Sequence, residues 1–222
     1  MTDRTILHGV TWHLECMVFS GGAIGNMRPP ADAFQMRMHY SLYLTNLMSA
    51  LDMMVETHGE AFQSALEARL ATSGQTGSEV LGYIRELRNG VVHRGIDPTS
   101  GGEVIADIVC AIAPATVQNR TGNRSYAAPA RLLRDIYTHC ELATKPVMER
   151  FLEQDIERLR SLSPASMVVD ALSAIENVPH MPDWAKEMVR THIAPEMLAM
   201  AQNHQIEKLK DLLKPRAIGA IA

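Results

Sequence analysis

Hydrophobic residues recur at helical spacing along most of the chain, separated by stretches rich in glycine and proline. Residues 4–19 carry such a pattern and predict a first helix that ends at Ser20-Gly21-Gly22. Apolar residues every three to five positions predict a long helix over 31–58. Gly59 then marks a break, and a shorter helix is expected over 60–71.

The next helix has the most regular pattern. Ser78 is a suitable N-cap residue, and the loop from Gly95 to Gly102 ends the segment. Between them the apolar positions follow helical spacing without a miss. They are Val80, Ile84, Leu87 and Val91.

The middle of the chain is ambiguous, whereas its end is again helical. Residues 103–117 are rich in β-branched side chains, which fit one short β-hairpin or a short helix equally well. Pro129 opens a further helix that Pro146 should kink or divide. Two or three amphipathic helices follow as far as about residue 213. We therefore predict an all-α fold, with a helical bundle over 1–160 and a C-terminal helical extension over 161–222.

Composition narrows the classes of protein that fit. A net charge of −4 argues against a protein that coats nucleic acid non-specifically, although a local basic patch stays compatible with it. The three cysteines are far apart and form no CxxC pair, as expected in a reducing cytosol. Neither a signal pattern nor an apolar run of about 18 residues is present. We expect a soluble, cytoplasmic protein without a membrane partner.

One segment carries a chemically suggestive motif, Arg88-Asn89-Gly90-Val91-Val92-His93, at the end of the most regular helix. This motif resembles the hallmark of the HEPN superfamily, an arginine followed by four to six residues and a histidine, often with asparagine after the arginine. The resemblance covers about ten residues and is supported by the helical layout of residues 1–160. It implies a HEPN-like up-and-down bundle, a homodimer with facing motifs, and metal-independent RNA cleavage of the defence or toxin type, without a cofactor.

The resemblance also assigns roles to the motif residues. His93 would take the proton from a ribose 2′-hydroxyl, Arg88 would stabilise charge on the phosphate, and Asn89 would orient the histidine or bind the RNA. On an undistorted helix, Arg88 and His93 lie about 140° apart. Either Gly90 lets the helix deform, or a second subunit completes the site. A purely structural role at a helix C-terminus also explains each residue singly.

Other basic residues follow the motif. Arg94 comes directly after it, and Arg120, Arg124 and Arg131 lie in a stretch without acidic residues. With Tyr126 this stretch could track phosphates and stack a base, or form an ordinary solvated loop. The alternative function is accordingly a non-catalytic helical module that binds RNA, an antitoxin or another protein partner.

Other patterns in the chain are weaker candidates for a site. A second arginine–histidine match occurs at Arg134 and His139, but it lacks the asparagine and the following glycine-containing loop. The histidines lack the spacing of metal ligands, so no metal site is expected. Residues 21–25 are glycine-rich but lack the Lys-Ser/Thr ending of a phosphate loop, and are interpreted as a linker.

Overall fold

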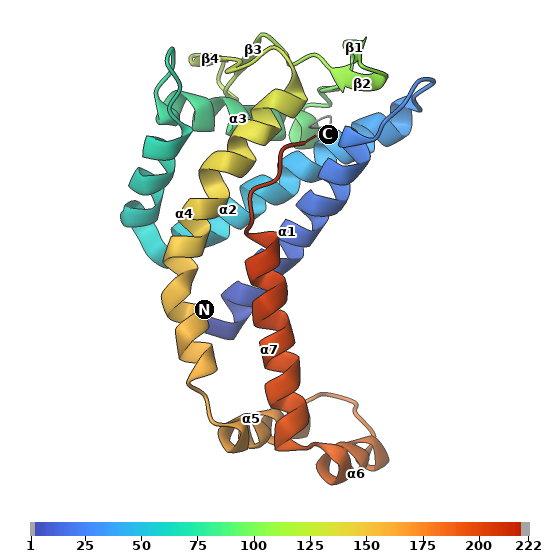
Figure 1. Ribbon diagram of the computed structural model, residues 1–222, viewed down its shortest axis with the longest axis vertical. Helices are drawn as coiled ribbons and strands as arrows, with labels where there is room; N and C mark the ends of the chain where they lie inside the picture. Colours follow the sequence, from blue (N-terminus) through green and yellow to red (C-terminus); the bar gives the residue numbers. More distant parts are fainter. Residues whose placement is uncertain (1–2, 219–222) are drawn as a thin grey trace. The chain divides into compact units, whose positions relative to one another are not determined.

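The computed structural model describes residues 3–218, which form seven helices and two small antiparallel sheets (Figure 1). The predominantly helical class is confirmed, whereas a HEPN-like arrangement of the bundle stays a prediction. In chain order the elements are α1 (Asp3–Gly25), α2 (Ala33–Leu70), α3 (Gly77–His93), β1 (Gly102–Ile105), β2 (Ile108–Ala111), β3 (Thr116–Gln118), β4 (Ser125–Ala127), α4 (Leu133–Arg160), α5 (Pro164–Glu176), α6 (Asp183–His192) and α7 (Pro195–Leu212).

The chain divides into two compact units. The first unit comprises the chain as far as Phe151 together with the residues from Leu212 onward, and the second comprises Leu152–Asp211. The second unit is thus an insertion in the sequence of the first, beginning within α4 and ending within the last turn of α7. The expected domain boundary after residue 160 stays a prediction.

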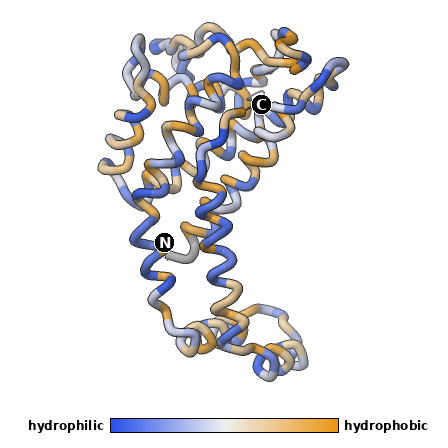
Figure 2. The backbone as a smooth tube through the Cα atoms, viewed as in Figure 1, coloured by the Kyte–Doolittle hydropathy of each residue, from blue (hydrophilic) through white to orange (hydrophobic). Residues whose placement is uncertain are grey.

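The core of the first unit is built by α1, α2, α3 and α4. Apolar and polar residues alternate along these helices (Figure 2), and the apolar ones are buried between them. Three tyrosines join α2 to α4: the rings of Tyr43 and Tyr137 stack with centroids 4.4 Å apart, and the Tyr137 hydroxyl donates to the Tyr40 carbonyl at 2.9 Å. Burial of such large rings contributes much of the packing energy.

Two helix boundaries differ from the expected ones. The first helix does not end at Ser20 but continues through three glycines to Gly25. The buried Ser20 hydroxyl donates to the Cys16 carbonyl at 2.7 Å, and Gly21 packs against Tyr43. These contacts offset the cost of about 1 kcal/mol for each glycine inside a helix. By contrast, the break at Gly59 is confirmed, because its φ of 62° and ψ of −148° suit glycine and interrupt α2.

The ambiguous middle region forms strands. β1 and β2 pair as the hairpin that was one of the two alternatives for 103–117. A second hairpin, β3 with β4, lies in the stretch interpreted as a loop. The helix expected to open at Pro129 begins only at Leu133, because residues 131 and 132 pair with 113 and 112. It then runs unbroken through Pro146.

The second unit contains the end of α4 and helices α5 to α7. Ser163 caps α5, and prolines precede or begin α5, α6 and α7. Arg190 of α6 pairs with Glu176 at the end of α5. Across residues 3–218, no helix combines the length and apolar character needed to cross a membrane.

Candidate functional site around Arg88 and His93

The candidate site stands on α3, which is anchored at its start by a capping box. Thr76, not Ser78, is the N-cap: its hydroxyl accepts from the Glu79 amide, and the Glu79 carboxylate accepts from the Thr76 amide at 2.8 Å. These hydrogen bonds from Thr76 lower the pKa of Glu79. α3 then stays helical across Gly90 as far as His93, so the deformation at Gly90, one of the two alternatives, does not occur.

The motif residues differ in exposure along this straight helix. Val80, Ile84 and Leu87 are buried as predicted, and Val91 is half-buried. His93 is exposed, and its imidazole makes no hydrogen bond or ion pair with any of residues 3–218. It therefore stands at the surface of the described part of the protein.

Arg88 is held on another side of the helix. Its guanidinium Nη2 lies 3.3 Å from Oδ2 of Asp52 on α2, and Arg85 reaches the same carboxylate at 3.8 Å. The Arg88 side chain is 24% exposed, and its Nε is buried without a hydrogen-bond partner among the described residues. Because α3 is unbroken, Arg88 and His93 leave it about 140° apart.

Asn89 and Arg94 both interact with Glu86, which precedes them on α3 by three and eight residues. The Asn89 amide donates to Glu86 at 3.4 Å. Arg94 donates to the Glu86 carboxylate at 3.2 Å, to the Glu86 carbonyl at 2.7 Å and to the Gln118 carbonyl at 2.6 Å. Arg94 therefore joins the end of α3 to β3. This is a structural role, which Arg94 has independently of any contact with RNA.

The second hairpin lies against the same side of α3. Tyr126 of β4 packs on Gly82, where an added Cβ would come within 2.2 Å of its ring. Gly82, Glu86, Asn89 and His93 share this side because they follow one another at intervals of three and four. Asn89, His93 and the β3–β4 hairpin thus lie on one side of α3, whereas Arg88 lies on another.

The arginines assigned to RNA occupy different positions on or near this hairpin. Arg120 lies exposed in the turn between β3 and β4, and Arg124 stacks over Tyr126 with 4.9 Å from guanidinium to ring centroid. Arg131 lies elsewhere and pairs with Glu103 on β1. Arg120 and Arg124 therefore belong to the hairpin that packs on the side of α3 that carries Asn89 and His93. Arg131 instead forms an ion pair with Glu103.

The competing match on α4 has a structural explanation. Nε2 of His139 lies 2.9 Å from the Leu70 carbonyl at the end of α2, so this nitrogen donates to a backbone group left unpaired by the helix. Arg134 is largely buried and lies 3.5 Å from Asp135. This pair secures helix ends, whereas His93 is exposed.

Two site residues escaped the sequence interpretation. Asp52 orients Arg88, and Glu86 holds Asn89 and Arg94. Asp52 could have been noticed, because it is the one acidic residue between Asp32 and Glu56, inside an apolar run of α2. A single carboxylate in such a run usually has a cationic partner.

No three histidine, cysteine, aspartate or glutamate side chains within the described residues gather into a cluster that would hold a metal ion. Comparison with known proteins found no family model, no curated protein and no solved structure that matches this chain.

Proposed function

We propose that this chain is a metal-independent endoribonuclease of the defence or toxin type, with a site of Arg88, Asn89 and His93 at a homodimer interface. The observation that carries the proposal is the unbroken α3. It ends at an exposed, unbonded His93, while Asp52 holds the Arg88 guanidinium on a different side of the helix. Two copies that pair through this region would place the histidine of one chain beside the arginine of the other.

The chemistry follows from the two side chains. Neutral imidazole exchanges protons near physiological pH, so His93 acts as the base that removes the proton of a ribose 2′-hydroxyl. The 2′-oxygen attacks the adjacent phosphorus, and the 5′-oxygen of the next nucleotide leaves. The products are a 2′,3′-cyclic phosphate and a 5′-hydroxyl. Arg88 stabilises the charge that gathers on the phosphate oxygens in the transition state.

The β3–β4 hairpin supplies the remaining contacts to RNA in this proposal. The exposed Arg120 would pair with backbone phosphates, and the Arg124–Tyr126 stack offers a flat surface for a base. The substrate is RNA and not DNA because the reaction uses the 2′-hydroxyl.

A non-catalytic module that binds RNA or a protein partner is the second candidate, and one observation favours it. Arg88 and Arg94 are already paired with Asp52 and Glu86, which reduces the positive charge available for a phosphate in the transition state.

Cleavage of RNA in the presence of EDTA distinguishes the two candidates. For the nuclease, His93→Ala and Arg88→Ala should each lower the rate by about 10²–10⁴-fold. His139→Ala is the matched control, because that histidine secures a helix end, and should keep the activity. Cleavage that survives His93→Ala, or that requires a divalent metal, would contradict the proposed chemistry.

Mixing the two inactive variants tests the shared site. If each site takes Arg88 from one chain and His93 from the other, a mixed dimer regains one intact site. Random pairing should then restore up to about a quarter of the wild-type activity. No recovery under conditions where subunits exchange would show that both residues act within one chain.

A further inference from the structure

The segment that follows α7, residues 213–218, lies along α4 without helical structure; we call it the return segment. Its main chain is bound at alternate residues by side chains of α4. The Lys145 ammonium donates to the Lys214 carbonyl at 3.5 Å. The Arg216 amide donates to Glu141 Oε2 at 3.3 Å, and the Ile218 amide to the Thr138 hydroxyl at 3.0 Å.

The three α4 residues are spaced for this task. Thr138, Glu141 and Lys145 follow at intervals of three and four, so they occupy one face of the helix. The partners run in the opposite order along the return segment, which therefore lies antiparallel to α4. All three of these bonds use backbone groups of the return segment. α4 thus recognises an extended peptide main chain.

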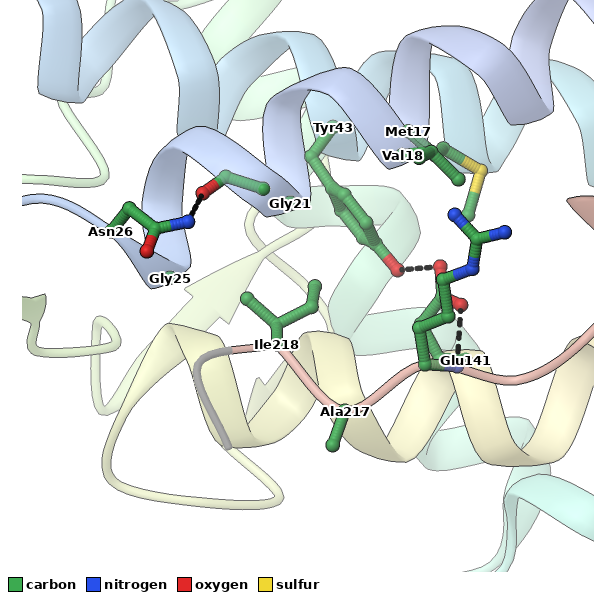
Figure 3. A pocket seen from close by; sticks show the side chains of 11 residues that line it. Met17, Val18, Gly21, Gly25, Asn26, Tyr43, Glu141, Ala217 and Ile218 are labelled. Atoms are coloured by element: carbon green, nitrogen blue, oxygen red, sulfur yellow. Dashed lines mark hydrogen bonds between the residues drawn. The ribbon is translucent and has the colours of Figure 1, made fainter. Parts of the chain in front are cut away.

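Two aliphatic side chains of the return segment are buried. Leu213 and Ile218 are buried, whereas the four residues between them are exposed. Ile218 faces Gly21 of α1 (Figure 3). A Cβ atom added at Gly21 would lie 3.5 Å from the nearest side-chain atoms of Ile218. The groove has α4 on one side and the glycine-rich end of α1 on the other, and Ile218 lies in it. Leu213, five positions earlier, is the other buried residue of the segment.

The return segment does not fill this groove. A cavity of about 300 Å³ remains, and the segment itself forms one wall of it. The Tyr43 hydroxyl, which donates to Glu141 at 3.0 Å, lies at the cavity (Figure 3). The rest of the lining comes from the glycine-rich end of α1, Tyr43 of α2 and Glu141 of α4, so the contact is looser than a close-packed core.

Beneath the return segment lies a buried ion pair. Lys145 Nζ and Glu141 Oε2 are 2.5 Å apart, and their side chains are 0% and 3% exposed. Burying two charges carries a desolvation cost of several kcal/mol per ion, only partly offset by their attraction. If the segment left, water would hydrate the Lys145 ammonium and the Glu141 carboxylate again. The free energy needed to release the segment is therefore lower than for an apolar contact of the same size.

We propose that the groove between α1 and α4 is a peptide-binding site, and that the return segment is an exchangeable intramolecular occupant. Its ligand is an extended peptide with two aliphatic residues separated by four others. This site is distinct from the Arg88–His93 surface and does not depend on the proposed nuclease activity.

Native-state hydrogen exchange on the full chain tests whether the occupant is released. The amides of Arg216 and Ile218 should be protected, yet should exchange at least about tenfold faster than the amides of α4 residues 138–145, because they open locally. Exchange of both amides only through global unfolding would overturn the proposal, since the segment would then be a permanent part of the core.

Peptide binding tests the ligand class directly. The probe is a labelled Leu-Lys-Pro-Arg-Ala-Ile peptide with blocked ends, added to the full-length wild type and to full-length Ile218→Asp. The wild-type segment competes at an effective millimolar concentration, so the variant should bind the probe at least about tenfold more tightly. A probe ending in Asp is the matched control and should not bind. Equal binding of both probes, or no saturable binding to a folded Ile218→Asp protein, would overturn the proposal.

Discussion

Oδ2 of Asp52 on α2 lies 3.3 Å from Nη2 of Arg88 on α3, so a carboxylate from a different helix orients the arginine of the candidate site. The pair links two consecutive helices through residues that are 36 positions apart in the sequence. It gives the guanidinium a defined direction while about a quarter of the side chain stays exposed.

Replacing Asp52 tests separately whether it orients Arg88 and how much it contributes to the free energy of unfolding. Asp52→Asn should lower RNA cleavage, because Arg88 loses the carboxylate that positions it, but by less than Arg88→Ala. The free energy of unfolding should change by no more than about 1 kcal/mol, since the pair is partly exposed. Arg85→Ala is the control, because Arg85 shares Asp52 without belonging to the motif. Cleavage kinetics and urea denaturation measure the two effects, and full activity of Asp52→Asn would remove Asp52 from the site.

The arginines near the hairpin should contribute unequally to RNA affinity. Arg120→Gln with Arg124→Gln should flatten the dependence of log K on log salt by up to about one unit for each phosphate that is no longer bound. Arg131→Gln should have a smaller effect, because Arg131 already pairs with Glu103. Binding titrations over a range of salt concentrations provide the measurement. Equal slopes in all variants and the wild type would leave the hairpin as a solvated loop.

The capping box at the start of α3 should make its stability depend on pH. The folded-state pKa of Glu79 is lowered by hydrogen bonds from Thr76, so the stabilisation is present above the unfolded-state pKa of about 4.3. It is lost as pH falls through the lower, folded-state value. Glu79→Gln should remove the part of the acid-induced loss of stability that comes from the Glu79 carboxylate. Thermal unfolding between neutral and acidic pH measures this difference. An unchanged pH profile would contradict this role.

At neutral pH the capping box of α3 can be tested by replacing its N-cap residue, Thr76. Thr76→Ala removes the N-cap hydroxyl and should destabilise the protein by about 1 kcal/mol. Ser78→Ala is the matched control, because Ser78 lies inside α3 and is not its N-cap. Equal destabilisation by both changes would contradict the observed cap.

The buried ion pair on α4 should respond strongly to the loss of one partner. Lys145→Met or Glu141→Met alone leaves an uncompensated buried charge and should cost about 3–5 kcal/mol. The double substitution should cost less than the two single changes together, because neither charge is then left buried without its partner. A double-mutant cycle in urea measures this coupling. Additive losses would show that the two charges do not depend on each other.

Much of the helical framework follows from local chemistry and was therefore predictable from sequence. The stripe Val80, Ile84 and Leu87 is buried because it recurs at helical spacing, and Gly59 interrupts α2 because it adopts backbone angles that suit glycine. The exposed position of His93 follows from the same periodicity. These properties depend only on residues close together in the chain.

Tertiary contacts decided the rest. Glycines inside α1 stay helical because Tyr43 and Ile218 pack against that helix. α4 begins only at Leu133 because the two preceding residues pair with residues 112 and 113, which follow β2. Asp52 meets Arg88, and Lys214 meets Lys145, across long separations in the chain. Periodicity describes which face of an element is apolar, but it contains no information on which distant residue will pack there. Local spacing could therefore identify the motif, while the partners that orient it arise only when the helices pack together.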